Sequence, residues 1–186
     1  GIVVLPGAGF DVVPTDCLSA LLKRELPSAT SLVLAFEAGG GPSPGTAKTS
    51  VEGLGKVGRA RIGGVVTRVP LAWKTRTFDR AGEPRHAMTI PWGDVYTAFV
   101  STGIPDIEVY MGVSPGTAKR LRRIRVLGPL LGWGPVQRWL RKKVERGVRG
   151  PSESTRGRTG CTVWGEVRDG DGREARRVLT TPNGYD

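Results

Sequence analysis

The first sixteen residues constrain the fold of this chain more than any other segment. Residues 2–5 are apolar and predict a short buried strand, and a glycine-rich bend at residues 6–13 leads from this strand into a helix. Thr15 or Asp16 is well placed to cap that helix, because a short polar side chain can accept a hydrogen bond from a free backbone N–H group. No turn, initiator Met or secretory leader precedes the strand, so we expect the chain to be a piece of a longer protein.

The pattern of apolar and polar residues predicts the remaining elements. Strands are expected at residues 31–36, 65–71, 73–78, 85–90, 107–113, 161–168 and 173–180. Helices are expected at residues 15–26, 46–54 and 94–100, and over most of 118–148, with breaks at Gly128-Pro129 and 132–135. Residues 65–90 indicate an antiparallel meander, residues 150–157 a loop, and Asp169-Gly-Asp-Gly172 a hairpin turn. We find no internal repeat. The expected fold class is α+β, with a mixed, largely antiparallel sheet covered by helices on one face.

Length and composition exclude several classes of protein. The 186 residues suit one domain, with room for the remnant of another, and no apolar stretch approaches the roughly 20 residues that a membrane span needs. Cys17, Cys161 and His86 do not make a zinc set, and two distant cysteines fit a reducing cytoplasm. Because His86 stands among strand residues, we interpret it as an ordinary strand histidine and find no hydrolase triad.

The net charge of +11 is concentrated in one stretch of the chain. Residues 119–158 contain thirteen Lys and Arg against two Glu, whereas the rest of the chain has fifteen cations and fifteen acids. Such a block attracts phosphates, acidic lipids, acidic carrier proteins or nucleic acid. The alternative is a solvated helix face with no specific partner.

The bend Gly7-Ala-Gly9-Phe-Asp-Val12 imitates the dinucleotide-binding fingerprint but departs from it at its third glycine. Val12 takes the place of the glycine that lets helix and strand pack closely, and Pro14 delays the helix start. We therefore expect no independent dinucleotide site here. The alternative is a tight turn in which Asp11 caps local backbone donors.

Two motifs bracket the helix expected at residues 94–100. Pro91-Trp92-Gly93-Asp94 precedes it and Ser101-Thr102-Gly103-Ile104-Pro105 follows it, so an indole, a carboxylate and hydroxyls stand at its two ends. A reductase needs an apolar wall and a few hydrogen-bonding groups to hold its substrate, which Trp92, Asp94 and Thr102 could supply. The alternative is a buried Trp, an N-cap Asp and a helix stop.

Residues 124–144 combine Leu, Val and two Trp with flanking cations. This combination is typical of segments that touch lipid headgroups or a long acyl tail. For a surface-active segment we expect Leu130, Trp133 and Trp139 to be partly exposed or to pack across a dimer interface, with Arg138, Arg141, Lys142 and Lys143 on the opposite side. The alternative is that the apolar side packs on the sheet and the cations extend into solvent.

Five segments, in order along nearly the whole chain, carry a resemblance to a known family. They are Gly9-Phe10-Asp11 with Pro14 and Asp16, Gly45-Thr46-Ala47, Pro91-Trp92-Gly93-Asp94, Ser101-Thr102-Gly103-Ile104-Pro105 with Glu108-Val-Tyr110, and Thr181-Pro182-Asn-Gly184-Tyr185. Together they resemble the saccharopine dehydrogenase-like oxidoreductases, including the trans-acting enoyl reductase branch. In that family a Rossmann domain that binds NAD or NADP precedes the Gly-Phe-Asp segment. The resemblance therefore implies that residues 1–13 are a remnant strand and junction loop of that domain, and that residues 14–186 form a substrate-binding and dimerisation domain.

The resemblance also implies a site and partners. It places Gly9 and Phe10 beside the cofactor, and Phe10, Asp11, Trp92, Asp94 and Thr102 around the substrate, with no catalytic residue assigned. The fragment alone is expected to hold no cofactor and to be inactive. The Trp- and Leu-rich segment favours a lipidic or acyl substrate over an amino acid. We expect a cytoplasmic homodimer whose residues 118–148 touch membranes peripherally.

A different class of protein fits part of the same pattern. A non-catalytic basic module would bind anionic membrane or nucleic acid through residues 119–158. Only 6% of the residues are aromatic, which gives little surface for stacking bases, so nucleic acid is the disfavoured partner.

Overall fold

The fold is built on one mixed sheet. The computed structural model describes residue 2, residues 9–10, 12–80 and 82–184, and an eight-stranded sheet of order β3-β2-β6-β1-β7-β8 forms its centre, with β5 also paired to β6 and β4 to β5. The strands are β1 (Ser31–Ala38), β2 (Gly58–Ile62), β3 (Val65–Val69), β4 (Thr75–Arg80), β5 (Glu83–Thr89), β6 (Asp106–Gly112), β7 (Cys161–Arg168) and β8 (Glu174–Thr181). β1 and β6 are parallel, and the other pairs are antiparallel. The predicted α+β class with a mixed, largely antiparallel sheet is confirmed.

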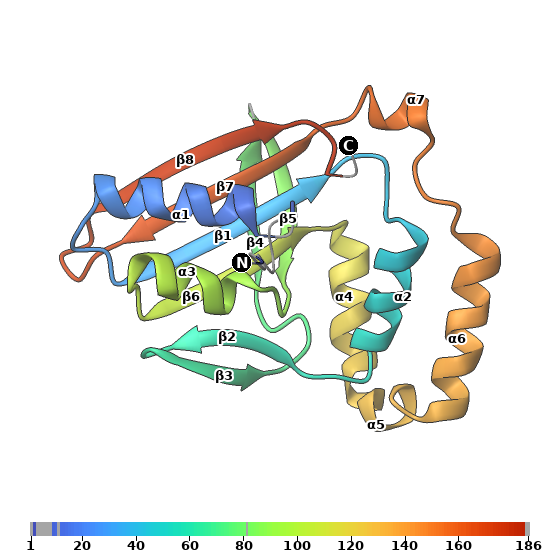
Figure 1. Ribbon diagram of the computed structural model, residues 1–186. Helices are drawn as coiled ribbons and strands as arrows, with labels where there is room; N and C mark the ends of the chain where they lie inside the picture. The colour runs from blue at the N-terminus through green and yellow to red at the C-terminus, as the bar shows by residue number, and fades with distance from the viewer. Residues whose placement is uncertain (1, 3–8, 11, 81, 185–186) are drawn as a thin grey trace.

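Helices cover one face of the sheet. The helices α1 (Val13–Glu25) and α3 (Asp94–Thr102) lie together on this face (Figure 1). Leu18 and Leu22 of α1 pack against β7 at Gly165, where an added Cβ would come within 2.5 Å of the Leu22 Cδ1 atom. The absence of a side chain at this position lets α1 approach the sheet closely, and the main core lies between them.

The opposite face is covered by a β-hairpin rather than by helices. The β4–β5 hairpin folds over it, so that the Phe78 ring centroid lies 5.9 Å from Tyr110 and 5.8 Å from Trp164. The indole Nε1 of Trp164 donates a hydrogen bond of 2.9 Å to the carbonyl of Asp79. This second, smaller core holds the hairpin on the sheet.

The expected antiparallel meander is confirmed for β4 and β5 but is wrong for β3. β3 pairs with β2, a strand that the sequence pattern does not predict, and β4 pairs with β5. Arg61 in β2 is buried, although a charged residue in the sequence is expected to lie on the surface. Its Nε donates to the Val95 carbonyl at 2.9 Å, and its guanidinium lies 3.9 Å from the centroid of the Phe99 ring. A buried cation with these partners breaks the apolar alternation that marks a half-buried strand.

The remaining helices form a separate layer beyond the carboxyl ends of β1 and β6 (Figure 1). They are α2 (Pro44–Gly53), α4 (Pro115–Ile124), the 3₁₀ turn η1 (Arg125–Leu127), α5 (Gly128–Leu131), α6 (Gly134–Gly147) and the single turn α7 (Glu153–Arg156). We call α2, α4, η1, α5 and α6 the helical group. The predicted breaks in residues 118–148 are confirmed, whereas α7 lies where a loop was expected.

Candidate functional site

Three segments that are far apart in sequence meet at the carboxyl end of β1. The Phe36 ring lies there, with its centroid 6.4 Å from that of Phe10 and 5.0 Å from that of Trp92. Gly184 also packs against Phe10, since an added Cβ would lie 2.9 Å from the Phe10 ring. We call Phe10, Phe36 and Trp92 the aromatic cluster. Phe10 and Trp92 are half-buried, so each keeps part of its ring surface open.

The turn that carries Phe10 is closed by its own backbone. The N–H groups of Val12 and Val13 donate to the Gly9 carbonyl at 3.2 and 3.0 Å, and Pro14 has no N–H group. A pyrophosphate at a helix N-terminus needs such donors to be free. Among the described residues at the start of α1, the N–H groups of Val12 and Val13 are therefore not free to bind a pyrophosphate.

Asp94 is a structural residue in this arrangement. Its side chain is fully buried, and its Oδ1 atom accepts a hydrogen bond of 2.5 Å from the Thr15 hydroxyl on α1. Gly93, not Asp94, is the N-cap residue of α3, so the expected capping role is wrong. Because a substrate cannot reach a buried carboxylate, we reassign Asp94 from substrate contact to holding the Trp92 turn against α1.

Thr102 is also remote from the aromatic cluster. It ends α3, eight residues after Asp94 and thus about 12 Å along the helix axis. Its buried hydroxyl donates to the Ala98 carbonyl and accepts from the Ile104 N–H at 3.2 Å, and the left-handed Gly103 follows. The expected substrate contact of Thr102 is corrected to a helix-terminating role. Asp11 lies outside the described residues.

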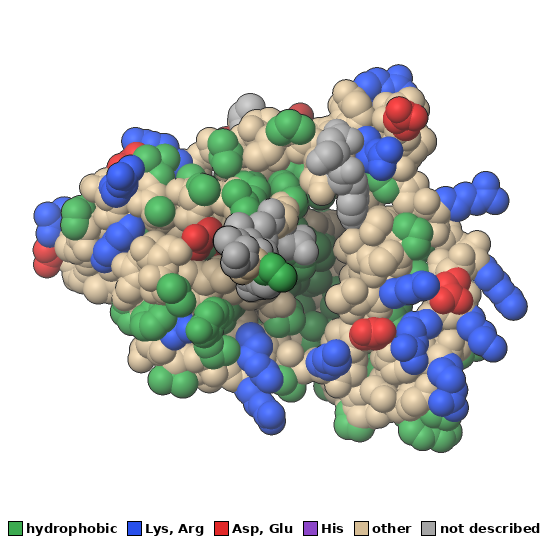
Figure 2. Space-filling view, in the orientation of Figure 1, with side chains coloured by type: hydrophobic (Ala, Val, Ile, Leu, Met, Phe, Trp, Pro, Cys, Tyr) green, Lys and Arg blue, Asp and Glu red, His purple; other side chains and the backbone are tan. Residues whose placement is uncertain are grey.

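An apolar surface extends from the aromatic cluster toward the helical group. Met111 and Val113 at the end of β6 and Leu121 on α4 are partly buried and pack against the same core as Phe10 and Trp92. Figure 2 shows a hollow between the sheet and the helical group, with hydrophobic side chains inside it. This surface suits the apolar part of a ligand.

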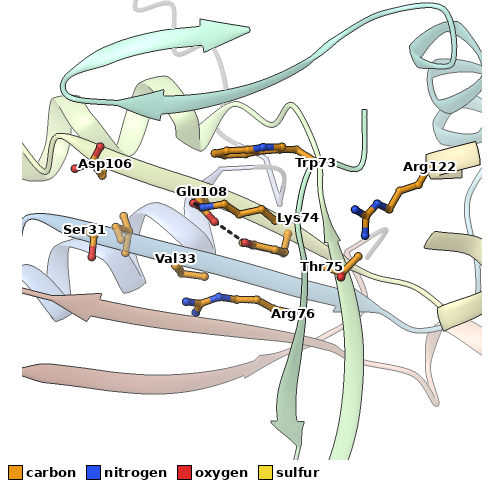
Figure 3. Close-up of a pocket in the computed structure, with 11 residues that line it drawn as sticks. Ser31, Val33, Trp73, Lys74, Thr75, Arg76, Asp106, Glu108 and Arg122 are labelled. Carbon is orange, nitrogen blue, oxygen red and sulfur yellow. Dashed lines mark hydrogen bonds and ion pairs between the residues drawn. The ribbon is translucent and has the colours of Figure 1, made fainter. Parts of the chain in front are cut away.

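A groove of about 410 Å³ lies on the opposite face of the sheet, beside the start of β4 (Figure 3). Trp73 forms a flat wall, and the Nζ atom of Lys74 lies 4.2 Å from the centroid of its ring. Lys74 is paired with Glu108, which also accepts a hydrogen bond from the Tyr110 hydroxyl. Burial, together with the hydrogen bond to Glu108, raises the pKa of Tyr110 well above its usual range. Arg122 points into the groove from α4 (Figure 3).

Sequence reasoning missed this groove because its ion pair joins distant residues. Lys74 and Glu108 are 34 positions apart in sequence, and they come into contact only in the folded chain. None of the residues expected to bind substrate lines it. Its carboxylate is engaged by two partners, so the groove lacks a free general base at Glu108.

A short repeat was also missed. Residues 43–48 and 114–119 share the sequence Ser-Pro-Gly-Thr-Ala-Lys, so the statement that the chain has no internal repeat is wrong. Each copy follows the carboxyl end of one of the parallel strands β1 and β6 and begins a helix. Ser43 accepts a hydrogen bond from the Thr46 N–H at 3.1 Å, and Ser114 from the Thr117 N–H at 3.2 Å. The repeat therefore sets two equivalent strand-to-helix junctions.

Other candidate residues have structural surroundings. The Nδ1 atom of His86 lies 3.2 Å from the Thr77 hydroxyl on the neighbouring strand, as an ordinary strand histidine would. Cys17 and Cys161 are free thiols. No group of three His, Cys, Asp or Glu side chains in the described part of the chain could hold a metal ion.

The chain matches no protein-family model, and no curated protein matches it significantly. The fold and the site define an α+β protein with a half-open aromatic cluster at the carboxyl end of a parallel strand pair.

Proposed function

We propose that this chain is the substrate-binding domain of an NAD(P)-dependent oxidoreductase of the saccharopine dehydrogenase-like type. The observation that carries the proposal is the meeting of three segments that underlie the resemblance. Residues 9–10, 91–94 and 181–184 are separated from one another by more than 80 positions. Phe10 nevertheless contacts Gly184, and both Phe10 and Trp92 pack against the ring of Phe36. This convergence is what a single cleft formed by these segments requires, and it supports the proposal.

The position of the aromatic cluster supports a ligand site. Ligands of open sheets with parallel strands bind beyond the carboxyl ends of those strands, and the cluster lies at that end of β1, next to β6. Phe10 and Trp92 provide flat apolar rings for one side of a substrate. The buried hydrogen bond between Asp94 and Thr15 fixes the Trp92 turn relative to α1.

The cofactor is proposed to be held by another domain. The N–H groups of Val12 and Val13 are not free to bind a pyrophosphate, so this chain is proposed to contribute a surface and not a phosphate site. A bound nicotinamide supplies or accepts the hydride. The residues of this chain exclude water from one side of the substrate and orient it, which is the main contribution of a protein to such chemistry.

Partly buried apolar side chains of the same core as the aromatic cluster favour a lipidic or acyl substrate. Met111, Val113 and Leu121 continue the apolar surface away from the aromatic rings, whereas a dicarboxylic amino acid needs cations aimed at its carboxylates. The buried Arg61 is engaged with the Phe99 ring, and Arg80 and Arg85 are paired with Glu37.

Ligand-observed NMR tests the substrate side on this chain alone. We expect a medium-chain trans-2-enoyl thioester to receive saturation from the protein, and NADPH to receive little. Trp92→Ala should weaken the thioester signal about tenfold, corresponding to the loss of an aromatic contact. Trp73→Ala, on the opposite face, is the matched control and should bind as the native chain does. Equal losses in both variants, or tight binding of NADPH, would contradict the proposal.

A further inference from the structure

The turn that joins α4 to α6 exposes four large apolar side chains. Val126, Leu127, Leu130 and Trp133 are 76%, 48%, 54% and 59% exposed. They lie at the end of the helical group that points away from the sheet (Figure 1), where Figure 2 shows green side chains with blue ones beside them. We call these four residues the apolar tip. Contiguous exposed apolar side chains with a polar rim mark a surface that contacts a membrane or another molecule.

The apolar tip is exposed although its backbone is held firmly. Gly55 packs directly on Gly132, since a Cβ on Gly55 would lie 2.4 Å from the Gly132 Cα atom. The buried Gln137 amide donates to the Leu131 carbonyl at 2.7 Å and to the Val51 carbonyl at 3.1 Å. These contacts tie α5 and the start of α6 to α2. The outward direction of Leu130 and Trp133 is therefore fixed by the fold.

Cations without acidic partners surround the apolar tip. The set consists of Arg122, Arg123, Arg125, Arg138, Lys142 and Lys143, and none of them forms an ion pair within the described residues. On α6, the first of these cations is Arg138, which follows Trp133 by five residues. At 1.5 Å per helical residue, this separation is about 7 Å along the helix axis. This spacing is similar to the depth to which interfacial segments enter the headgroup region, roughly 5–10 Å.

Trp139 adds a second interfacial feature on α6. Its side chain is 61% exposed, and the Nζ atom of Lys143 lies 5.4 Å from the centroid of its ring. The expected separation of tryptophans and cations onto opposite sides is therefore wrong, although the expected exposure of Leu130, Trp133 and Trp139 is confirmed. Mixed tryptophans and cations are enriched where a protein meets lipid headgroups.

An apolar groove of about 420 Å³ continues the apolar tip. Leu54, Val57, Leu71 and Val126 contribute its apolar walls, and Lys56 and Arg125 also line it. This combination suits an acyl chain whose anionic headgroup stays near the cations.

We propose that the apolar tip docks on the surface of an anionic lipid bilayer. No helix in the described part of the chain is long and apolar enough to cross a bilayer, so the contact is peripheral. A second copy of the chain is the weaker partner, because a two-fold contact through the tip would bring two sets of unpaired cations together. Nucleic acid would use the cations but leave the apolar tip in water. The inference is independent of the proposed function, since no residue of the tip belongs to the aromatic cluster.

Vesicle flotation tests the proposal. We expect the chain to float with vesicles that contain phosphatidylserine, to remain behind with pure phosphatidylcholine, and to bind less as salt increases. The double variant Leu130→Ala with Trp133→Ala should lower the partition coefficient at least about tenfold. The matched control is Tyr96→Ala with Val100→Ala, which removes an equally exposed aromatic and aliphatic pair from α3 and should leave flotation unchanged.

A second measurement keeps the test valid if the double variant unfolds. Lipids with brominated acyl chains should quench the native tryptophan fluorescence, and Trp133→Phe should keep flotation while losing the part of that quenching that Trp133 contributes, with Trp139 accounting for the remainder. Absence of flotation at low salt would overturn the proposal. So would equal flotation with neutral vesicles, equal loss in the Tyr96/Val100 control, or salt-sensitive binding to duplex DNA without binding to anionic vesicles.

Discussion

At the scale of single residues, Gly165 sets the distance between α1 and the sheet. An alanine there would place its Cβ 2.5 Å from Leu22 Cδ1 and 3.0 Å from Leu18 Cδ2. We predict that Gly165→Ala lowers the free energy of unfolding by about 1–3 kcal/mol, because a packed core resists an added methyl group. Urea denaturation measures this change in the free energy of unfolding. Gly170→Ala, where an added Cβ meets no atom within 4 Å, is the control; equal stability of both variants would show that α1 does not pack as described.

The residues that sequence reasoning misplaced share a physical cause. Asp94 and Arg61 are charged side chains that the fold buries, each satisfied by a partner on a distant segment, Thr15 for the first and the Val95 carbonyl for the second. Such pairs have no local signal. Phe10 and Trp92 could be recognised because their motifs resemble those of a family. The two residues were expected to line one cleft, and their ring distances from Phe36 are compatible with that expectation.

At the scale of elements, the repeated Ser-Pro-Gly-Thr-Ala-Lys segments begin two helices in the same way. We predict that Ser114→Ala costs about 1 kcal/mol of stability, because the side chain that caps the Thr117 N–H is lost. Ser43→Ala should cost a similar amount at α2. Thermal unfolding of both variants and of Ser154→Ala, an exposed serine that is not an N-cap, measures the effect; unchanged stability in both capping variants would remove the structural reason for the repeat.

Asp169, in the turn of the β7–β8 hairpin, is a carboxyl group whose pKa is lowered by its surroundings. A hydrogen bond from Ser28, followed by the backbone N–H and guanidinium of Arg173, holds the pKa of Asp169 below its usual range. A lowered carboxyl pKa stabilises the fold above the unfolded value of about 3.8, and that contribution is lost as the pH falls through the lower folded value.

We therefore predict that Asp169→Asn lowers the urea midpoint at neutral pH and makes it less sensitive to acid below about pH 4. The native chain should lose stability over that range, and the variant should lose less. The control is Asp171→Asn at an exposed position of the same turn. Parallel pH profiles of the native chain and Asp169→Asn would contradict the assignment.

At the scale of the whole molecule, the sequence predicts the sheet better than its covering. The fold class and seven of the eight strands were predicted from apolar alternation and from short apolar runs, the latter because β1 and β7 are buried along most of their length. The β4–β5 hairpin follows from the strands predicted at residues 73–78 and 85–90. Its position over the second face could not be predicted, because Phe78 and Trp164 meet across strands that are far apart in sequence. The helical group was foreseen as broken helices, but its position beyond the strand ends depends on tertiary contacts such as Gln137 with Val51.

The two proposals assign different functions to two separate parts of the molecule. The aromatic cluster lies at the carboxyl end of β1, and the apolar tip lies at the far end of the helical group (Figure 1). A protein that takes a lipidic substrate gains from docking on the bilayer that contains it. The homodimer expected from the resemblance stays a prediction.

Hydride transfer by the complete gene product that contains these 186 residues tests the central claim most directly. With deuterated NADPH and a trans-2-enoyl thioester, we predict deuterium in the reduced product. Trp92→Ala should lower kcat about 10- to 100-fold with the cofactor Kd unchanged, because substrate orientation is lost while the nucleotide site is intact. Trp73→Ala should leave both constants unchanged. A gene product that binds no nicotinamide cofactor, or a Trp92→Ala variant that transfers deuterium at the native rate, would contradict the assignment of this chain as the substrate-binding domain of such an enzyme.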